Sequence, residues 1–442
     1  MKELKHEFTS YRSPVFSSKG MVASSQPLAS AIGVKILTLG GNAADAAVAV
    51  AAALNVTEPT STGIGGDAFA LFYDAKTKKV EAINGSGRAP AGLTLKLLDQ
   101  QGMGEELPKF HPHAVTVPGA CACWVDTVAR WGTMEMKDVL APAIELAREG
   151  FPVAPLTAAS WKAGAQRQLS QSPNGEELMI DGRAPFPGER FSNLNLAKTF
   201  QLVAEGGKSA YYQGPIAEAI VEVLSTNGGT MTLDDLANHT STFVNPISTD
   251  YRGVRVWECP PNGQGLAALM ALNILEGYDI ANVDPLSPQR MHLLIEAMRL
   301  AFLDARYYVA DPDTNPAPLK ELLSKNYAAY RRKEINLEHA SPKLRYGVPF
   351  AGTDTVYFSV VDAEGNACSF INSNYMGFGT GIVPKSFGFT LQNRGHNFSL
   401  DPAHPNALAP NKRPYHTIIP AMATRVSDDS LYACFGVMGG FM

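Results

Sequence analysis

The feature that most constrains this chain is a pair of apolar segments joined by a short turn, at residues 355–373. Residues 356–361 are rich in β-branched and aromatic side chains, which is typical of a buried strand. Residues 362–365 have the composition of a turn, and residues 366–373 follow as the returning strand of a hairpin. Thr355 opens the first strand. Because threonine is common in strands, spacing alone leaves both a structural and a catalytic role open for it.

This region resembles the γ-glutamyltranspeptidase family, whose proenzymes cleave themselves just before a threonine that opens a strand. The family's motifs T-x-x-x-S-V-V-D, G-N-A and F-G-T-G-I match residues 355–362, 365–367 and 378–382 without a gap. The resemblance extends over nearly the whole chain. It implies an α+β fold, the four-layer αββα sandwich of the N-terminal nucleophile hydrolases. It also implies a large subunit, 1–354, and a small subunit, 355–442, as parts of one interlaced fold.

The end of the chain departs from the family. The sequence stops at Met442, whereas the family continues, so we expect the C-terminal part of the fold to be missing and the small subunit to be incomplete. An oxyanion hole close to a free terminus is expected to fray. A truncated, non-catalytic relative that acts by binding is therefore one alternative.

Composition argues against several other classes of protein. A net charge of -5 does not favour nucleic-acid binding, which requires a basic face. The longest apolar stretch, residues 43–56, is interrupted by Asp45 and is too short to cross a bilayer. Residues 1–20 contain no apolar run typical of a signal peptide, and the five scattered cysteines favour free thiols. We therefore expect a cytoplasmic protein with no membrane partner.

The resemblance supplies a mechanism for Thr355. Cleavage between Asp354 and Thr355 frees an α-amino group, whose unperturbed pKa of about 7.7–8.0 suits a base for the neighbouring hydroxyl. One residue then provides nucleophile and base, so no cofactor or metal is expected. The resemblance implies that Ser373 supports the nucleophile and that the backbone amides of Gly439 and Gly440 form the oxyanion hole. Water would resolve the acyl-enzyme.

The residues expected to bind substrate differ from the family pattern. Asn397 stands where the family has an acidic residue for the glutamyl amine, and Arg394 stands where it has a glutamine. His416 and Thr417 replace a Ser-Ser pair, and Tyr375 replaces an asparagine. These changes resemble the branch of the family that contains oxamate amidohydrolase. A packed core histidine is an equally good interpretation of His416.

Arg88 is a further candidate for the substrate pocket. The family's clamp arginine stands three places before an Ala-Pro pair, where this chain has Ser86, and Arg88 directly precedes Ala89. A guanidinium can bind a carboxylate through two parallel N–H groups. Arg88 and Arg394 together suggest an amidohydrolase whose substrate is an oxamate-like amide of a small acidic acyl group. Glutathione hydrolysis or γ-glutamyl transfer is the alternative activity. The expected partners are a small-molecule amide substrate and the chain's own cleaved subunit.

Two other sites are weaker candidates. The glycine-rich loop 57–67 lacks the lysine of a P-loop and the spacing of a dinucleotide site. Cys121 and Cys123 are close in sequence, and His292 lies one helical turn from Glu296, but neither pair has a third ligand nearby. A metal-dependent hydrolase is therefore the least favoured alternative.

Overall fold

The predicted hairpin lies at the centre of a six-stranded antiparallel sheet. In the computed structural model, which describes residues 13–341 and 355–438, β9 (Val356–Val361) pairs with β10 (Ala367–Ser373). The strand order is β1 (Met21–Ala23), β9, β10, β2 (Asp67–Asp74), β3 (Lys79–Gly85), β6 (Thr242–Val244). The expectations for Asp354, Gly439 and Gly440 fall outside the described residues.

A second, four-stranded antiparallel sheet packs against the first. Its order is β12 (Leu431–Val437), β11 (Ile419–Arg425), β8 (Val254–Glu258), β7 (Ile247–Tyr251). The apolar side chains of Phe69, Leu71, Ile371 and Met422 are buried between the two sheets. Alternate residues of a strand face opposite sides, so the other side chains of β2 and β10 are free to pack on helices.

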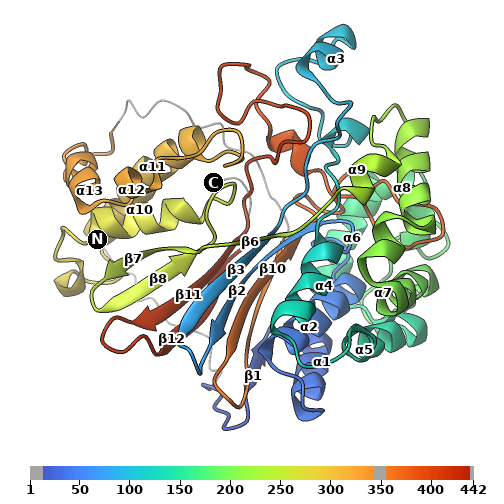
Figure 1. Cartoon of the computed structure of the whole chain (residues 1–442), viewed down its shortest axis with the longest axis horizontal. Helices are drawn as coiled ribbons and strands as arrows, with labels where there is room; N and C mark the ends of the chain where they lie inside the picture. Colours follow the sequence, from blue (N-terminus) through green and yellow to red (C-terminus); the bar gives the residue numbers. More distant parts are fainter. Residues whose placement is uncertain (1–12, 342–354, 439–442) are drawn as a thin grey trace, which may run out of the picture.

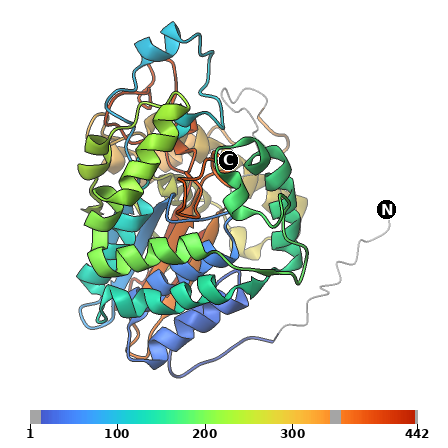
Figure 2. The same cartoon turned by 90° about the vertical axis from the view of Figure 1, so that its right-hand side faces the viewer.

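Helices cover the outer face of the six-stranded sheet (Figure 1). The main ones are α1 (Pro27–Thr38), α2 (Ala43–Thr57), α4 (Ala120–Trp131), α5 (Met136–Glu149), α7 (Leu194–Tyr212) and α8 (Pro215–Thr226). Every residue of α2 is buried, and its run of alanines permits this close packing on all sides. Asn42 caps α2 in a reciprocal capping box with Asp45. Figure 2 shows helices of this layer lying across the sheet.

A second group of helices covers the four-stranded sheet, which completes four layers and confirms the predicted αββα fold (Figure 1). It contains α10 (Gly265–Leu275), α11 (Pro288–Tyr308), α12 (Leu319–Leu322) and α13 (Lys325–Arg332). The remaining elements are α3 (Leu95–Gln100), α6 (Pro155–Arg167), α9 (Leu233–Ala237), β4 (Phe151–Pro152) and β5 (Arg190–Phe191). None of the helices described has the length and apolarity that crossing a bilayer requires.

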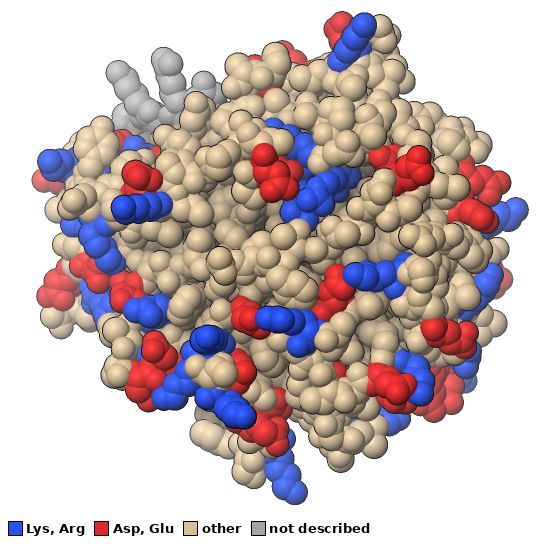
Figure 3. Space-filling model, viewed as in Figure 1, with Lys and Arg blue, Asp and Glu red and all other residues tan. Residues whose placement is uncertain are grey.

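The two parts of the chain on either side of residue 355 share both sheets. β9 and β10 lie between β1 and β2, while β11 and β12 extend the sheet that β8 and β7 begin. This interlacing places Thr355, at the start of β9, beside Ser373 at the end of β10. On the molecular face shown in Figure 3, acidic and basic side chains are interspersed.

Candidate active site

The hydroxyl groups of Thr355 and Ser373 are in direct contact. Their oxygens lie 2.9 Å apart, and both side chains are buried. Ser373 Oγ also accepts hydrogen bonds from the Tyr375 backbone N–H at 2.8 Å and from Arg394 Nη2 at 3.2 Å. Because those two N–H groups occupy its lone pairs, the Ser373 proton is left for Thr355 Oγ1. The serine therefore orients the threonine oxygen.

Arg394 is a buried cation beside these hydroxyls. Its side chain has no exposed surface, and Nη1 donates to Thr417 Oγ1 at 2.7 Å. Burial lowers its pKa to about 10, so the guanidinium is still charged at neutral pH. Both oxygens that it contacts here are neutral hydroxyls, and Nε has no hydrogen-bond partner among the described residues. A buried charge without a bonded counter-ion is costly, which favours an anionic ligand at this place.

Tyr375 supports the guanidinium from one side. The Arg394 Cζ atom lies 4.4 Å from the centre of the tyrosine ring, close enough for a cation–π interaction. The backbone of Tyr375 has a φ of 76°, a left-handed conformation that is strained for a bulky residue. In this conformation the backbone N–H of Tyr375 donates to Ser373 while the ring packs on Arg394. The strained backbone therefore accompanies two contacts of the cluster.

A buried acid–imidazole pair borders the cluster. His416 Nε2 lies 3.1 Å from Asp67 Oδ2, and neither side chain is exposed. Asp67 Oδ1 accepts from the backbone N–H groups of Gly87 at 3.0 Å and Gly119 at 3.2 Å. Burial, with a further contribution from the charge of Arg394, lowers the pKa of His416 to about 4 against the opposing effect of Asp67. The imidazole is therefore neutral near pH 7.

Asp67 has no place among the sequence-predicted site residues. It stands at the end of a glycine-rich loop and opens β2, where it lies opposite Ser373 in the strand register. The available signal was a carboxylate that directly precedes the apolar run of residues 68–72. His416 is also a packed residue, since its ring lies 4.7 Å from that of Phe69.

Two sequence-predicted residues have their described contacts elsewhere. Arg88 pairs with Asp313 at 3.4 Å and lines a cavity of about 270 Å³ together with Thr232 and His239. Asn397 donates from Nδ2 to the Tyr415 carbonyl oxygen at 3.0 Å and supports the backbone before His416. The structure thus brings together Thr355, Ser373, Tyr375, Arg394 and Thr417, with His416 at their border through Asp67.

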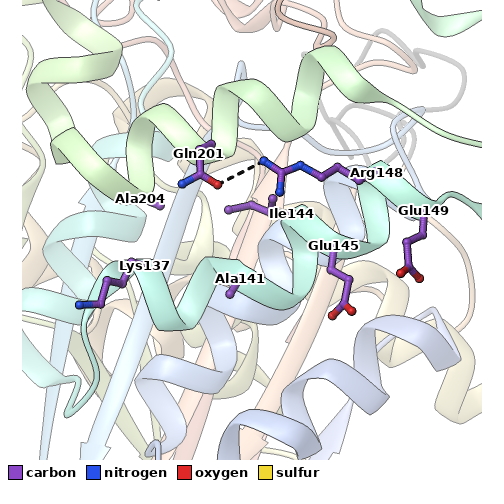
Figure 4. A pocket seen from close by; sticks show the side chains of 8 residues that line it. All are labelled: Lys137, Ala141, Ile144, Glu145, Arg148, Glu149, Gln201 and Ala204. Atoms are coloured by element: carbon purple, nitrogen blue, oxygen red, sulfur yellow. Dashed lines mark hydrogen bonds between the residues drawn. The ribbon is translucent and has the colours of Figure 1, made fainter.

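Other hollows and clusters offer less chemistry. A cavity of about 300 Å³ lies between α5 and α7, where Arg148 donates to Gln201 at 3.4 Å (Figure 4). Its charged lining residues are exposed, while Ile144 is buried. Cys121 and Cys123 are buried in α4, where burial raises their thiol pKa values. His292 contacts the carbonyl oxygen of Asn336 at 2.6 Å. Within the described residues, no three His, Cys, Asp or Glu side chains are grouped to hold a metal.

The four layers and the threonine at the start of a central strand define an N-terminal nucleophile hydrolase fold. Residues 29–442 match the family described as Gamma-glutamyltranspeptidase, and the chain belongs to that family. It is 40% identical over 426 residues to the "Glutathione hydrolase-like YwrD proenzyme" of Bacillus subtilis, covering 96% of this chain and 80% of that protein.

Two other relatives bear on the expected substrate. The chain is 34% identical to the oxamate amidohydrolase proenzyme of Klebsiella pneumoniae, over 96% of this chain and 79% of that one. A crystal structure of a cephalosporin acylase from Bacillus halodurans is similar with a TM-score of 0.91 and 46% identity, over 99% of this chain and 80% of that one. The similarities support the family but do not single out the oxamate branch, because YwrD is more similar than the oxamate enzyme.

Proposed function

We propose that this chain is a self-processing amide hydrolase with Thr355 as its nucleophile. The peptide bond between Asp354 and Thr355 breaks when the Thr355 hydroxyl attacks the preceding carbonyl and water releases the resulting ester. The freed α-amino group then takes the hydroxyl proton while Thr355 Oγ1 attacks a substrate amide. The amine leaves with that proton, and water hydrolyses the acyl-enzyme. The contact with Ser373 and the family membership support this assignment.

The substrate that the buried cluster favours carries a carboxylate on its acyl part. The observation that carries this proposal is Arg394, a fully buried guanidinium whose two described side-chain hydrogen bonds go to hydroxyls. One of those hydroxyls, Ser373, also contacts Thr355. A carboxylate bound to Arg394 would thus place a nearby amide carbonyl close to the nucleophile. Monoamides of short dicarboxylic acids, with oxamate as the smallest, meet this description.

Self-cleavage is tested on a denaturing gel with N-terminal sequencing. Wild-type protein should give two pieces, the smaller of which begins with Thr355. Thr355→Ala should remain whole, whereas Thr355→Ser should still be cut because it keeps a hydroxyl. Thr38→Ala is a matched control on the outside of α1 and should be cut normally. A wild-type chain that stays whole would overturn the nucleophile and favour the non-catalytic alternative.

Glutathione hydrolysis is the second candidate, because several relatives at 34–40% identity carry that name. The two candidates are separated by comparing ammonia release from oxamate with release of the chromophore from a γ-glutamyl anilide. In this chain Asn397 replaces the acidic residue expected to hold a glutamyl amine, so we expect oxamate or a longer monoamide to be preferred. Preference for the anilide would reverse the assignment of substrate while leaving the nucleophile in place.

A further inference from the structure

The imidazole of His416 has a defined tautomer. The carboxylate of Asp67 can only accept, and its Oδ1 already receives two backbone N–H groups, so its Oδ2 must receive the Nε2 proton of His416. Nδ1 of the neutral ring is then a hydrogen-bond acceptor. It is fully buried and has no partner among the described residues. Most buried polar atoms are satisfied, so this lone pair calls for a donor that the described protein does not provide.

The residue that carries this acceptor is linked to the buried guanidinium through its neighbours, and the charge of Arg394 contributes to lowering the pKa of His416. Thr417, the next residue in the chain, receives the hydrogen bond of Arg394 Nη1. Asp67 lies opposite Ser373, which receives the hydrogen bond of Arg394 Nη2. Arg394 Nε is also buried without a partner among the described residues. The cluster thus contains an unused donor, Nε of the cationic Arg394, and an unused acceptor, Nδ1 of the neutral His416.

We propose that His416 determines specificity by accepting a hydrogen bond, at Nδ1, from a neutral O–H or N–H of the acyl group whose carboxylate binds Arg394. The inference rests on the proposed function and narrows its substrates. It assigns acids that carry a hydroxyl or an amide N–H close to the carboxylate. An ammonium group fits less well, because it would approach the charge of Arg394.

The test measures binding of two matched acids to the self-cleaved protein by calorimetry. Succinate and racemic 2-hydroxysuccinate differ only in the hydroxyl group. Wild type should bind the hydroxy acid about tenfold more tightly, the usual effect of one added neutral hydrogen bond to a buried partner. In His416→Gln the amide nitrogen can still donate to Asp67 from the position of Nε2, but the amide oxygen, attached to the same carbon, does not take the position of Nδ1. The preference should therefore fall below about twofold, with the melting temperature retained.

Asp67→Asn provides a second variant that a purely structural role would not explain. Its Oδ1 still accepts from Gly87 and Gly119, so its amide N–H₂ faces His416 Nε2 and makes that nitrogen the acceptor. The proton then moves to Nδ1, which becomes a donor that a hydroxyl can still satisfy by accepting. Asp67→Asn should therefore gain affinity for racemic 2-methoxysuccinate, whose ether oxygen only accepts, whereas wild type should bind this acid no better than succinate. His416→Asn, whose side-chain oxygen can occupy the position of Nδ1, should recover part of the preference for the hydroxy acid that His416→Gln loses.

The outcomes separate this inference from the proposed function. Equal binding of both acids by wild type, with affinity lost in Arg394→Gln, would overturn the role of His416 and leave the carboxylate site intact. A preference that survives in His416→Gln would overturn it as well. Failure of wild type to bind either acid would overturn the acceptor and the guanidinium site together.

Discussion

Replacing Arg394 by glutamine isolates the contribution of the buried charge. The family resemblance implies glutamine at this position, and glutamine retains an N–H₂ group that can reach one of the two hydroxyls, Thr417 or Ser373. The substitution therefore removes the charge with little change in shape. We therefore expect a large change in selectivity for anionic over neutral substrates and a small change in folding stability.

The expected magnitude follows from the surroundings of the guanidinium. A charge-assisted hydrogen bond in a buried site contributes about 2–3 kcal/mol, so selectivity for a carboxylate should fall roughly 30- to 150-fold. Stability should change little, because the loss of hydrogen bonds of about 1 kcal/mol each is offset by relief of a buried charge that has no directly bonded counter-ion and is only partly balanced by the Asp67 carboxylate. For a chain of this length the melting temperature should therefore shift by no more than about 3 °C.

The assay compares kcat/KM for succinamate with kcat/KM for its methyl ester, which lacks the charge. Taking this ratio removes any effect that Arg394 exerts on both substrates through Ser373. Arg255→Gln is the matched control, since Arg255 of β8 pairs with Asp250 of β7 outside the cluster, and its ratio should equal that of wild type. The reasoning is refuted if Arg394→Gln keeps the ratio within about threefold of wild type, or if it unfolds the protein.

Three further perturbations follow from the geometry. Tyr375→Asn should lower the same substrate ratio about 3- to 30-fold by removing the ring from Arg394, whereas Tyr375→Phe should stay within about threefold of wild type. Asp45→Ala should cost about 3 kcal/mol in urea unfolding, because Asp45 accepts from the backbone N–H groups of Asn42 and Thr133; the exposed Asp138→Ala should cost less than about 1 kcal/mol. Because burial lowers the pKa of His416 to about 4 while an unfolded histidine titrates near 6.5, protonation favours unfolding, and the melting temperature should fall as pH drops from about 6.5 to 4 and fall less steeply in His416→Gln.

The sequence predicted the elements whose signals are local. The β-branched and aromatic content and the turn composition around residues 356–373 predicted the hairpin, and the family motifs placed Thr355 at its start. The motif comparison also identified Tyr375, Arg394 and Thr417 as unusual, and the structure places them within one cluster with Ser373.

The rest depended on contacts between distant segments. Asp67 precedes His416 by 349 residues, and only the register of β2 against β10 shows that both border the same buried cluster. The type of a residue also does not give its direction. Arg88 was as good a carboxylate ligand as Arg394 by its chemistry, yet its guanidinium contacts Asp313.

The topology predicts that the two cleaved pieces remain one particle. β10 pairs with β2 over seven registered residue pairs, from Ala367 with Tyr73 to Ser373 with Asp67, and β11 pairs with β8 over five more. Apolar side chains from both pieces fill the space between the sheets. Separation would therefore expose a hydrophobic core and break three strand pairings, β1 with β9, β10 with β2 and β11 with β8. Cleaved protein should therefore elute from a native sizing column as a species of at least 47.3 kDa while a denaturing gel resolves two bands. Elution of the pieces as separate, smaller species would show that cleavage before Thr355 does not preserve the interlaced sheets on which the site depends.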